Sequence, residues 1–157
     1  MASCNKKNIL DAQAIAEKDP FSTRNNIRVT AAYADGSGEG ELTITPECLN
    51  PRGAVHGGCL ATLANAVSGW VAGAVQHCNS ATASYTLNFL RPAMGTNQKI
   101  RCRATPEKTG RTLSVYHVSL TDDEGLEVAT GNFTFFMMDK RLNGTTPERL
   151  ERTADES

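Results

Sequence analysis

The feature of this sequence that most constrains its fold is a long stretch without charge. Between Arg52 and Arg91 the chain contains no Asp, Glu, Lys or Arg. Within this stretch, residues 57–77 have helical spacing, with one apolar face made of Leu60, Leu63, Ala64, Val67, Val71 and Ala74. The opposite face is small and uncharged, at Ala61, Asn65, Gly69 and Ala72. A surface helix normally has one charged face, so a curved sheet, a second subunit or both must cover this one.

A membrane-spanning helix is the alternative for an uncharged segment of this length. Polar residues interrupt the apolar run at Thr62, Asn65, Ser68, Gln76 and two histidines, which leaves it too broken for a span. We therefore expect no membrane span, and we expect the helix to be wrapped by its own sheet.

The rest of the chain predicts an α+β fold. A helix is expected at 8–19, capped by Asn8 and followed by Pro20. Strands are expected at 26–34 and 40–45 before the long helix, and at 81–91, 97–108, 111–121 and 125–138 after it. This order divides the chain into an N-terminal helix and lead-in (1–24), one domain (25–138) and a polar C-terminal tail (139–157).

Composition excludes several classes of protein. The net charge of −1, from 16 basic and 17 acidic residues, gives no basic stripe for nucleic acid. The five cysteines are irregularly spaced and include no Cys-x-x-Cys, which predicts no disulfide framework, no metal site and a reducing compartment. No apolar segment follows Lys6 and Lys7, so we expect no secretory signal and a cytoplasmic location.

The start of the long helix carries the candidate chemistry. His56-Gly57-Gly58 precedes the helical run, and glycine lets a backbone approach a ligand closely. The first N–H groups of a helix have no partner within it, so they can stabilise a developing oxyanion. A glycine turn that simply enters a helix is the plain alternative.

Four segments together resemble one known family. They are Asn50-Pro-Arg-Gly-Ala-Val-His-Gly-Gly-Cys-Leu-Ala-Thr-Leu-Ala-Asn65, then Thr82-Ala-Ser-Tyr-Thr-Leu-Asn-Phe-Leu-Arg-Pro-Ala93, then Gly110-Arg-Thr112, and Gly125-Leu-Glu-Val-Ala129. This combination resembles the hotdog acyl-CoA thioesterases related to the phenylacetate-pathway thioesterase and to mammalian thioesterase superfamily member 2. The resemblance covers roughly residues 8–138.

The resemblance implies a hotdog fold, in which a curved antiparallel sheet wraps around one long central helix. It implies a homodimer with active sites at the interface, dimers that pair into a homotetramer, and an acyl-CoA substrate with no further cofactor. The Gly57 N–H would polarise the thioester carbonyl, His56 and Asn50 would support it, and Thr82 would help to hold the attacking water. Such a protein is expected in the cytoplasm or in association with mitochondria.

The chain departs from this family at Asn65, where the family typically carries an acidic base or nucleophile contributed by the opposite subunit. An amide neither accepts the proton of water nor attacks a thioester at neutral pH. His56, Cys59 and Glu47 are the nearby replacements to consider. Three explanations stay open: an engineered Asp→Asn change, a natural enzyme of low activity or rearranged base, and a protein that binds acyl-CoA without hydrolysing it.

Basic residues near strand ends are expected to meet the phosphates of coenzyme A. They are Arg91, Lys108 and Arg111, of which Gly110-Arg111 in a tight turn is the strongest candidate. Solvated edge charges are the alternative for each. Leu60, Leu63, Trp70 and Tyr85 are candidates for the acyl pocket. An enoyl-CoA hydratase would need an Asp and His pair on another motif, which this chain lacks.

Overall fold

A computed structural model describes residues 6–138 of the chain. Two short helices, α1 (Ala12–Lys18) and α2 (Pro20–Arg24), precede strands β1 (Ile27–Ala32) and β2 (Gly38–Thr43). A 3-10 turn, η1 (Pro46–Cys48), leads to the long helix α3 (Gly57–Gln76). The remaining strands are β3 (Ser80–Phe89), β4 (Lys99–Lys108), β5 (Leu113–Thr121) and β6 (Glu127–Met137). The expected α+β layout and the order of its main strands and long helix are therefore confirmed.

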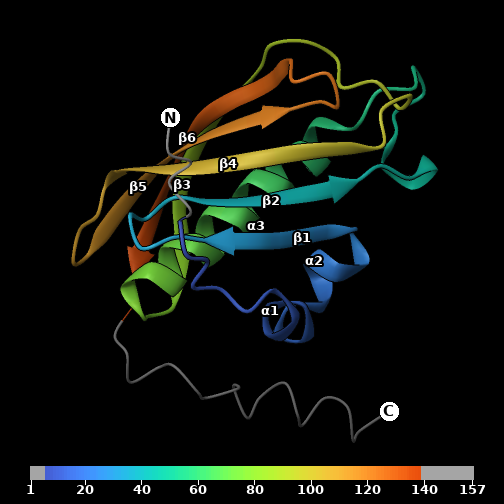
Figure 1. The fold of residues 1–157 in the computed structure, drawn as a ribbon. Helices are drawn as coiled ribbons and strands as arrows, with labels where there is room; N and C mark the ends of the chain where they lie inside the picture. The colour runs from blue at the N-terminus through green and yellow to red at the C-terminus, as the bar shows by residue number, and fades with distance from the viewer. Residues whose placement is uncertain (1–5, 139–157) are drawn as a thin grey trace, which may run out of the picture.

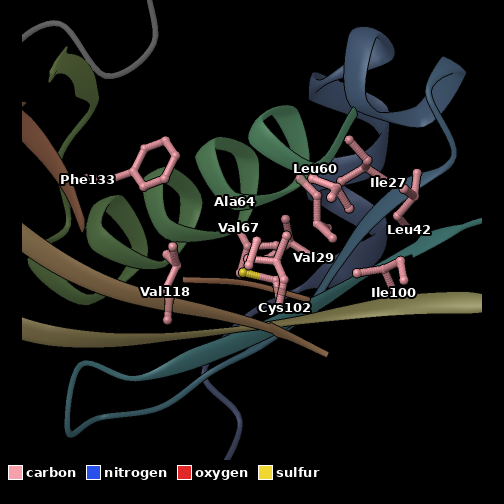
Figure 2. Close-up of a cluster of buried hydrophobic side chains, with 14 of the residues drawn as sticks. Ile27, Val29, Leu42, Leu60, Ala64, Val67, Ile100, Cys102, Val118 and Phe133 are labelled. Carbon is pink, nitrogen blue, oxygen red and sulfur yellow. The ribbon is translucent and has the colours of Figure 1, made fainter. Parts of the chain in front are cut away.

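The six strands form one antiparallel sheet in the order β1-β2-β4-β5-β6-β3. The sheet curves around α3, which lies along one of its faces (Figure 1). Figure 2 shows side chains of α3, such as Leu60, Ala64 and Val67, directed at residues of the strands, such as Ile100 and Val118. These residues belong to one buried apolar core between helix and sheet. The core contains most of the apolar face of α3 predicted from the sequence. Ala74 only packs against it, and Ala72, expected on the opposite face, is fully buried in it.

α3 ends one residue before the predicted boundary. His77 is its C-cap in a left-handed conformation (φ 53°), and its backbone N–H bonds to the Gly73 carbonyl. By length and composition α3 alone among the described residues could cross a membrane, with a mean hydropathy of 1.4 over an 18-residue window. The core helix of a soluble protein passes the same test, so this is weak evidence for a span. Its buried face packs on the sheet, as expected.

The expected helix at 8–19 is wrong in its start. Asn8 instead forms a β-bridge with Tyr33, and its side-chain oxygen accepts hydrogen bonds from the N–H groups of Leu10 and Ala32. The helix begins only after Asp11, whose carboxylate accepts from the N–H groups of the first turn. Pro20 also does more than follow a helix, because it is the first residue of α2. The lead-in thus contains two helices, joined at Asp19.

Candidate active site

A short hairpin loop precedes α3 and leads directly into its first turn. The Asn50 side-chain oxygen accepts from the N–H of Arg52 at 2.9 Å and from that of Ala54 at 3.1 Å. Gly53 has a positive φ of 79°, which glycine adopts without strain and which closes the turn. The His56 N–H then donates to the Cys48 carbonyl at 2.8 Å. Asn50 therefore shapes the loop that sets the position of the helix start.

The first turn of α3 presents two backbone donors. Within residues 6–138 the N–H groups of Gly57 and Gly58 have no acceptor, and the His56 side chain makes no capping bond. The dipole of the 20-residue helix adds partial positive charge at this end. The Phe89 ring lies against Gly57, where a β-carbon would come within 3.0 Å of it. Glycine therefore lets the Phe89 ring pack closely against the helix start, and the two N–H groups without acceptors are available to an anionic oxygen.

Asn65 and Thr82 form the second part of the candidate site. The Thr82 hydroxyl donates to the Asn65 side-chain oxygen at 2.6 Å, and both residues are exposed. A β-bulge at Ala83 shifts the register of β3 against β6 between Thr82 and Ser84. The bulge adds one residue, so Thr82 and Phe89 both face α3 although they are seven positions apart. The resemblance implied a water-holding role for Thr82, and the structure adds that its hydroxyl is bonded to Asn65.

The two parts of the site are separated along α3. Asn65 lies eight residues after Gly57 in the helix, which corresponds to a rise of about 12 Å. Reacting groups must stand within about 3 Å of the carbonyl they act on. One copy of the chain therefore does not bring the Gly57 N–H and the Asn65 side chain to the same carbonyl.

Two of the three alternative bases, Cys59 and Glu47, are poorly suited to replace the missing carboxylate. Burial raises the pKa of the Cys59 thiol, and the neighbouring Cys48 acts in the same direction, so Cys59 is not poised as a thiolate. The Glu47 side chain is exposed, and hydrogen bonds from its own backbone N–H and from Thr45 lower the pKa of its carboxyl. A general base at neutral pH needs a raised pKa. His56 is exposed beside the helix start and is the titratable side chain adjacent to the Gly57 N–H in sequence.

The expected coenzyme A residues fall at opposite ends of α3. Arg91 is exposed just after Phe89, at the end that holds Gly57. Gly110 lies at the other end, where the Gln76 side chain donates to its carbonyl at 2.8 Å. Arg111 follows in the same turn and is exposed, as is Lys108. The basic residues therefore form two separate groups in one copy of the chain.

The turn between β4 and β5 is held in place by a network that sequence reasoning missed. Ser114 is fully buried, and its hydroxyl donates to the Gln76 side-chain oxygen at 2.6 Å. The Gly110 N–H in turn donates to the Ser114 hydroxyl at 3.2 Å. A β-carbon at Gly110 would come within 2.1 Å of the Leu113 carbonyl oxygen, so this position has room only for glycine.

The candidate acyl-pocket residues divide between core and groove, except Tyr85, which is 53% exposed on β3 and lies in neither. Leu60 is 3% exposed and Leu63 is fully buried, so both belong to the core. Trp70 instead lines an open groove of about 1530 Å³ along the uncovered face of α3. Asn65 and Thr82 line the same groove. No cluster of three or more His, Cys, Asp or Glu suited to a metal ion occurs in the part of the chain that the structure describes.

Comparison with known proteins extends these observations. Residues 45–136 match the family described as the acyl-CoA thioesterase N-terminal domain. Comparison with curated protein sequences gives no match. Among solved structures, the Escherichia coli PaaI protein of the phenylacetic acid degradation operon is 21% identical with a TM-score of 0.75, covering 82% of this chain and 91% of its own. The expected hotdog fold is thereby confirmed.

Two further solved structures hold ligands. A protein from Streptococcus pneumoniae described as a hypothetical thioesterase, solved with coenzyme A, is 25% identical with a TM-score of 0.70, over 78% of this chain and 96% of that one. A protein from Streptococcus mutans bound to acetyl-CoA is 25% identical with a TM-score of 0.67, over 73% of this chain and 90% of that one.

Proposed function

The chain belongs to the acyl-CoA thioesterase family, and from this premise we propose that it acts on an acyl-CoA at a site built from two copies of the chain. The enzyme class expected from the sequence, a hydrolase of thioester bonds, is confirmed by this membership. The coenzyme A and acetyl-CoA held by the two streptococcal structures support the choice of substrate. The details below concern how this chain would perform the reaction.

The β3 edge supports pairing of two copies. β3 pairs with β6 on one side only and ends the sheet. It contains ten residues, none charged, and it exposes Tyr85 and Phe89 by 53% and 54%. Natural sheets protect long exposed edges with charges, proline or a covering segment, and none of these occurs within β3 itself. An unprotected apolar edge of this kind is suited to a second copy of itself.

Antiparallel pairing about a twofold axis at Thr86 would complete the site. Opposite residues in such a pair must face the same side of the sheet. With Thr86 opposite its own copy, Tyr85 lies opposite Leu87, and beyond the bulge Thr82 lies opposite Phe89. Because Phe89 contacts Gly57 and Thr82 contacts Asn65, this register brings the Asn65 of one copy toward the Gly57 N–H of the other.

The proposed reaction is hydrolysis. Water attacks the thioester carbonyl carbon, the Gly57 N–H stabilises the oxygen that becomes negative, and the carbon–sulfur bond breaks. The departing thiolate takes the proton that water loses, which leaves a carboxylic acid and coenzyme A. The Asn65 amide, with its oxygen bonded to Thr82, can orient the water but cannot accept its proton. No cofactor is needed for these steps.

The test is the rate of coenzyme A release by this protein and by Asn65→Asp. A positioned base contributes about 10²- to 10⁴-fold to a reaction of this kind, so we expect the Asn65→Asp variant to be at least 100-fold faster. Asn132→Asp is the matched control, since it makes the same change on the exposed outer face of β6. Equal rates for the unchanged protein and for Asn65→Asp would show that Asn65 does not occupy the position of the base.

A second function, acyl-CoA binding without turnover, is favoured by the same amide. It predicts that the unchanged protein and Asn65→Asp both bind acyl-CoA and that neither releases thiol.

We also propose that dimers pair into a tetramer and that the protein works in the cytoplasm. Sedimentation of the purified protein and fractionation of cells test these two points.

A further inference from the structure

A wide groove runs beside the Asn65–Thr82 pair along the face of α3 that the sheet does not cover. Its floor includes Ala66, Gly69 and Gly73, which continue from Asn65 toward the end of the helix. On one side it is bounded by α1 and α2, and on the other by the start of β3 and by Phe135. The volume of about 1530 Å³ exceeds that of an ordinary ligand pocket, about 300–1,000 Å³, because the groove is open on one side.

The sole tryptophan of the chain forms a wall of this groove. The Trp70 indole N–H donates to the Asp19 carboxylate at 2.9 Å. The same carboxylate accepts from the Ser22 hydroxyl at 2.6 Å and from the Ser22 N–H at 3.0 Å. Three donors therefore hold Asp19 at the corner between α1 and α2, and Asp19 in turn fixes the ring of Trp70.

These bonds also occupy the one carboxylate that contacts Trp70. Partial burial alone would raise the pKa of Asp19, but the hydrogen bonds from Ser22 and Trp70 outweigh it and lower the pKa, so the carboxylate is ionised and bonded to three donors. The floor on α3 carries no charge, and Phe135 adds a second ring. The other charged residues on the groove, Asp11 and Lys18, lie on the N-terminal segment. The surface nearest to Asn65 thus suits an uncharged, apolar group.

Resting on the proposed function, we infer that Trp70, fixed by Asp19, is the specificity-determining residue of this enzyme and selects acyl groups of medium length over acetyl. An acyl chain whose carbonyl is at Asn65 enters the groove directly, since Asn65 and Trp70 line the same space. The groove follows α3 from Asn65 to Gly73, a rise of about 12 Å. Acetyl fills none of this length, whereas octanoyl lies along the indole.

The first experiment uses the emission of Trp70 in the unmodified full chain, because no other tryptophan contributes. Octanoyl-CoA is expected to shift the emission, while acetyl-CoA and free coenzyme A leave it unchanged. The same three ligands are titrated by calorimetry, which does not depend on the fluorophore. If octanoyl-CoA leaves the emission unchanged while a rise in protein concentration alters it, then a second copy covers the groove and the inference is wrong.

The second experiment measures the ratio of octanoyl-CoA to acetyl-CoA affinity in variants. Trp70→Ala is expected to lower this ratio at least tenfold, and Trp70→Phe to lower it less, because the ring remains. Asp19→Asn keeps an oxygen acceptor for the indole and should preserve the ratio, while Asp19→Ala should lower it. Leu126→Ala is the control, since Leu126 is 45% exposed and lies outside the groove. Ala66→Leu narrows the floor of the groove and should weaken the binding of octanoyl-CoA but not that of acetyl-CoA. This variant tests the inference even if Trp70→Ala does not fold.

The outcomes separate this inference from the proposed function. An equal loss of affinity for both ligands in Trp70→Ala would assign Trp70 a purely structural role and overturn the inference. Chain-length selection by Trp70 without thiol release from Asn65→Asp would refute hydrolysis but leave the groove assignment standing. If neither ligand binds, both the function and the inference are refuted.

Discussion

Replacing Tyr116 with phenylalanine is expected to stabilise the protein. Tyr116 lies on β5 beneath α3 and is fully buried, with its ring edge-on to that of Phe135 at 6.5 Å between centroids. Its hydroxyl has no hydrogen-bond partner among residues 6–138. A buried polar group without a partner loses its hydrogen bonds to water and gains none in the fold, which destabilises the folded state. Tyr116→Phe keeps the ring and removes only that group.

The size of the effect can be worked out from these contacts. An unsatisfied buried polar group costs about 1–3 kcal/mol. The void left by one oxygen, roughly 15 Å³, costs about 0.4 kcal/mol at about 24 cal/mol per Å³. The net gain expected is therefore about 0.6–2.6 kcal/mol. For a chain of this length each kcal/mol raises the melting temperature by about 2–4 °C.

Ionisation of Tyr116 also makes the stability of the protein depend on pH in the alkaline range. Burial raises the pKa of Tyr116 to about 12, and the negative charge of Asp35 acts in the same direction. The unfolded hydroxyl ionises near pH 10. The stability linked to this group is therefore complete below about pH 10 and falls, as pH rises from about 10 toward 12, by about 1.4 kcal/mol per pH unit. Tyr116→Phe removes this part of the alkaline loss.

Thermal unfolding at pH 7 and between pH 9 and 11 tests both expectations. Tyr33→Phe is the control, because Tyr33 is only half-buried and should change stability by less than about 0.5 kcal/mol. A loss of more than about 1 kcal/mol in Tyr116→Phe at pH 7 would mean that the hydroxyl makes a stabilising bond, and the reasoning would be refuted.

Two further changes test the sheet edge and the tight turn. Thr86→Lys places two like charges opposite each other in the proposed pairing of β3 strands, so the dimer measured by sedimentation velocity should weaken; Thr134→Lys, on the inner strand β6, should leave it intact. Gly110→Ala forces a β-carbon to within 2.1 Å of the Leu113 carbonyl oxygen and should destabilise the protein by about 1–3 kcal/mol in denaturant unfolding. Gly125→Asn is the control and should have a smaller effect, because Gly125 has a positive φ and open space around it.

The sequence predicted the long helix and the positions of the strands along the chain well, because local patterns determine them. α3 combines helical spacing of apolar residues with glycines at its start, and it ends within one residue of the predicted position. β5 alternates buried and half-buried residues along its whole length, which is the period of a strand with one face on the core. Such patterns depend on residues close together in the chain.

The N-terminal helices were predicted less well because distant contacts decide where they begin. Asn8 has the right chemistry for a helix cap, but its side chain is bound to Ala32, 24 residues away. Asp19 was not expected to have a role, and it binds Trp70, 51 residues away. Neither partner can be identified from periodicity or from turn signals, since both arise from how α1 and α2 pack on the sheet and on α3.

The candidate site shows the same division between local and distant information. The glycines at the start of α3 were visible in the sequence, because helix geometry alone leaves their N–H groups without acceptors. The contact of Asn65 with Thr82 depends on the bulge at Ala83, without which Thr82 and Phe89 would face opposite sides of the sheet. The residue identities were thus predictable, while the geometry that joins them was not.

Asn65 has a different meaning once this geometry is known. Its side-chain oxygen accepts the Thr82 hydroxyl, and a carboxylate in its place would keep that bond with one oxygen and leave the second oxygen for the proton of water. The change between the two side chains therefore alters proton transfer without disturbing the contact that orients the residue. This is why Asn65→Asp should restore rate while preserving affinity, and why a binding-only protein could keep the whole fold of an enzyme and differ from it at a single atom.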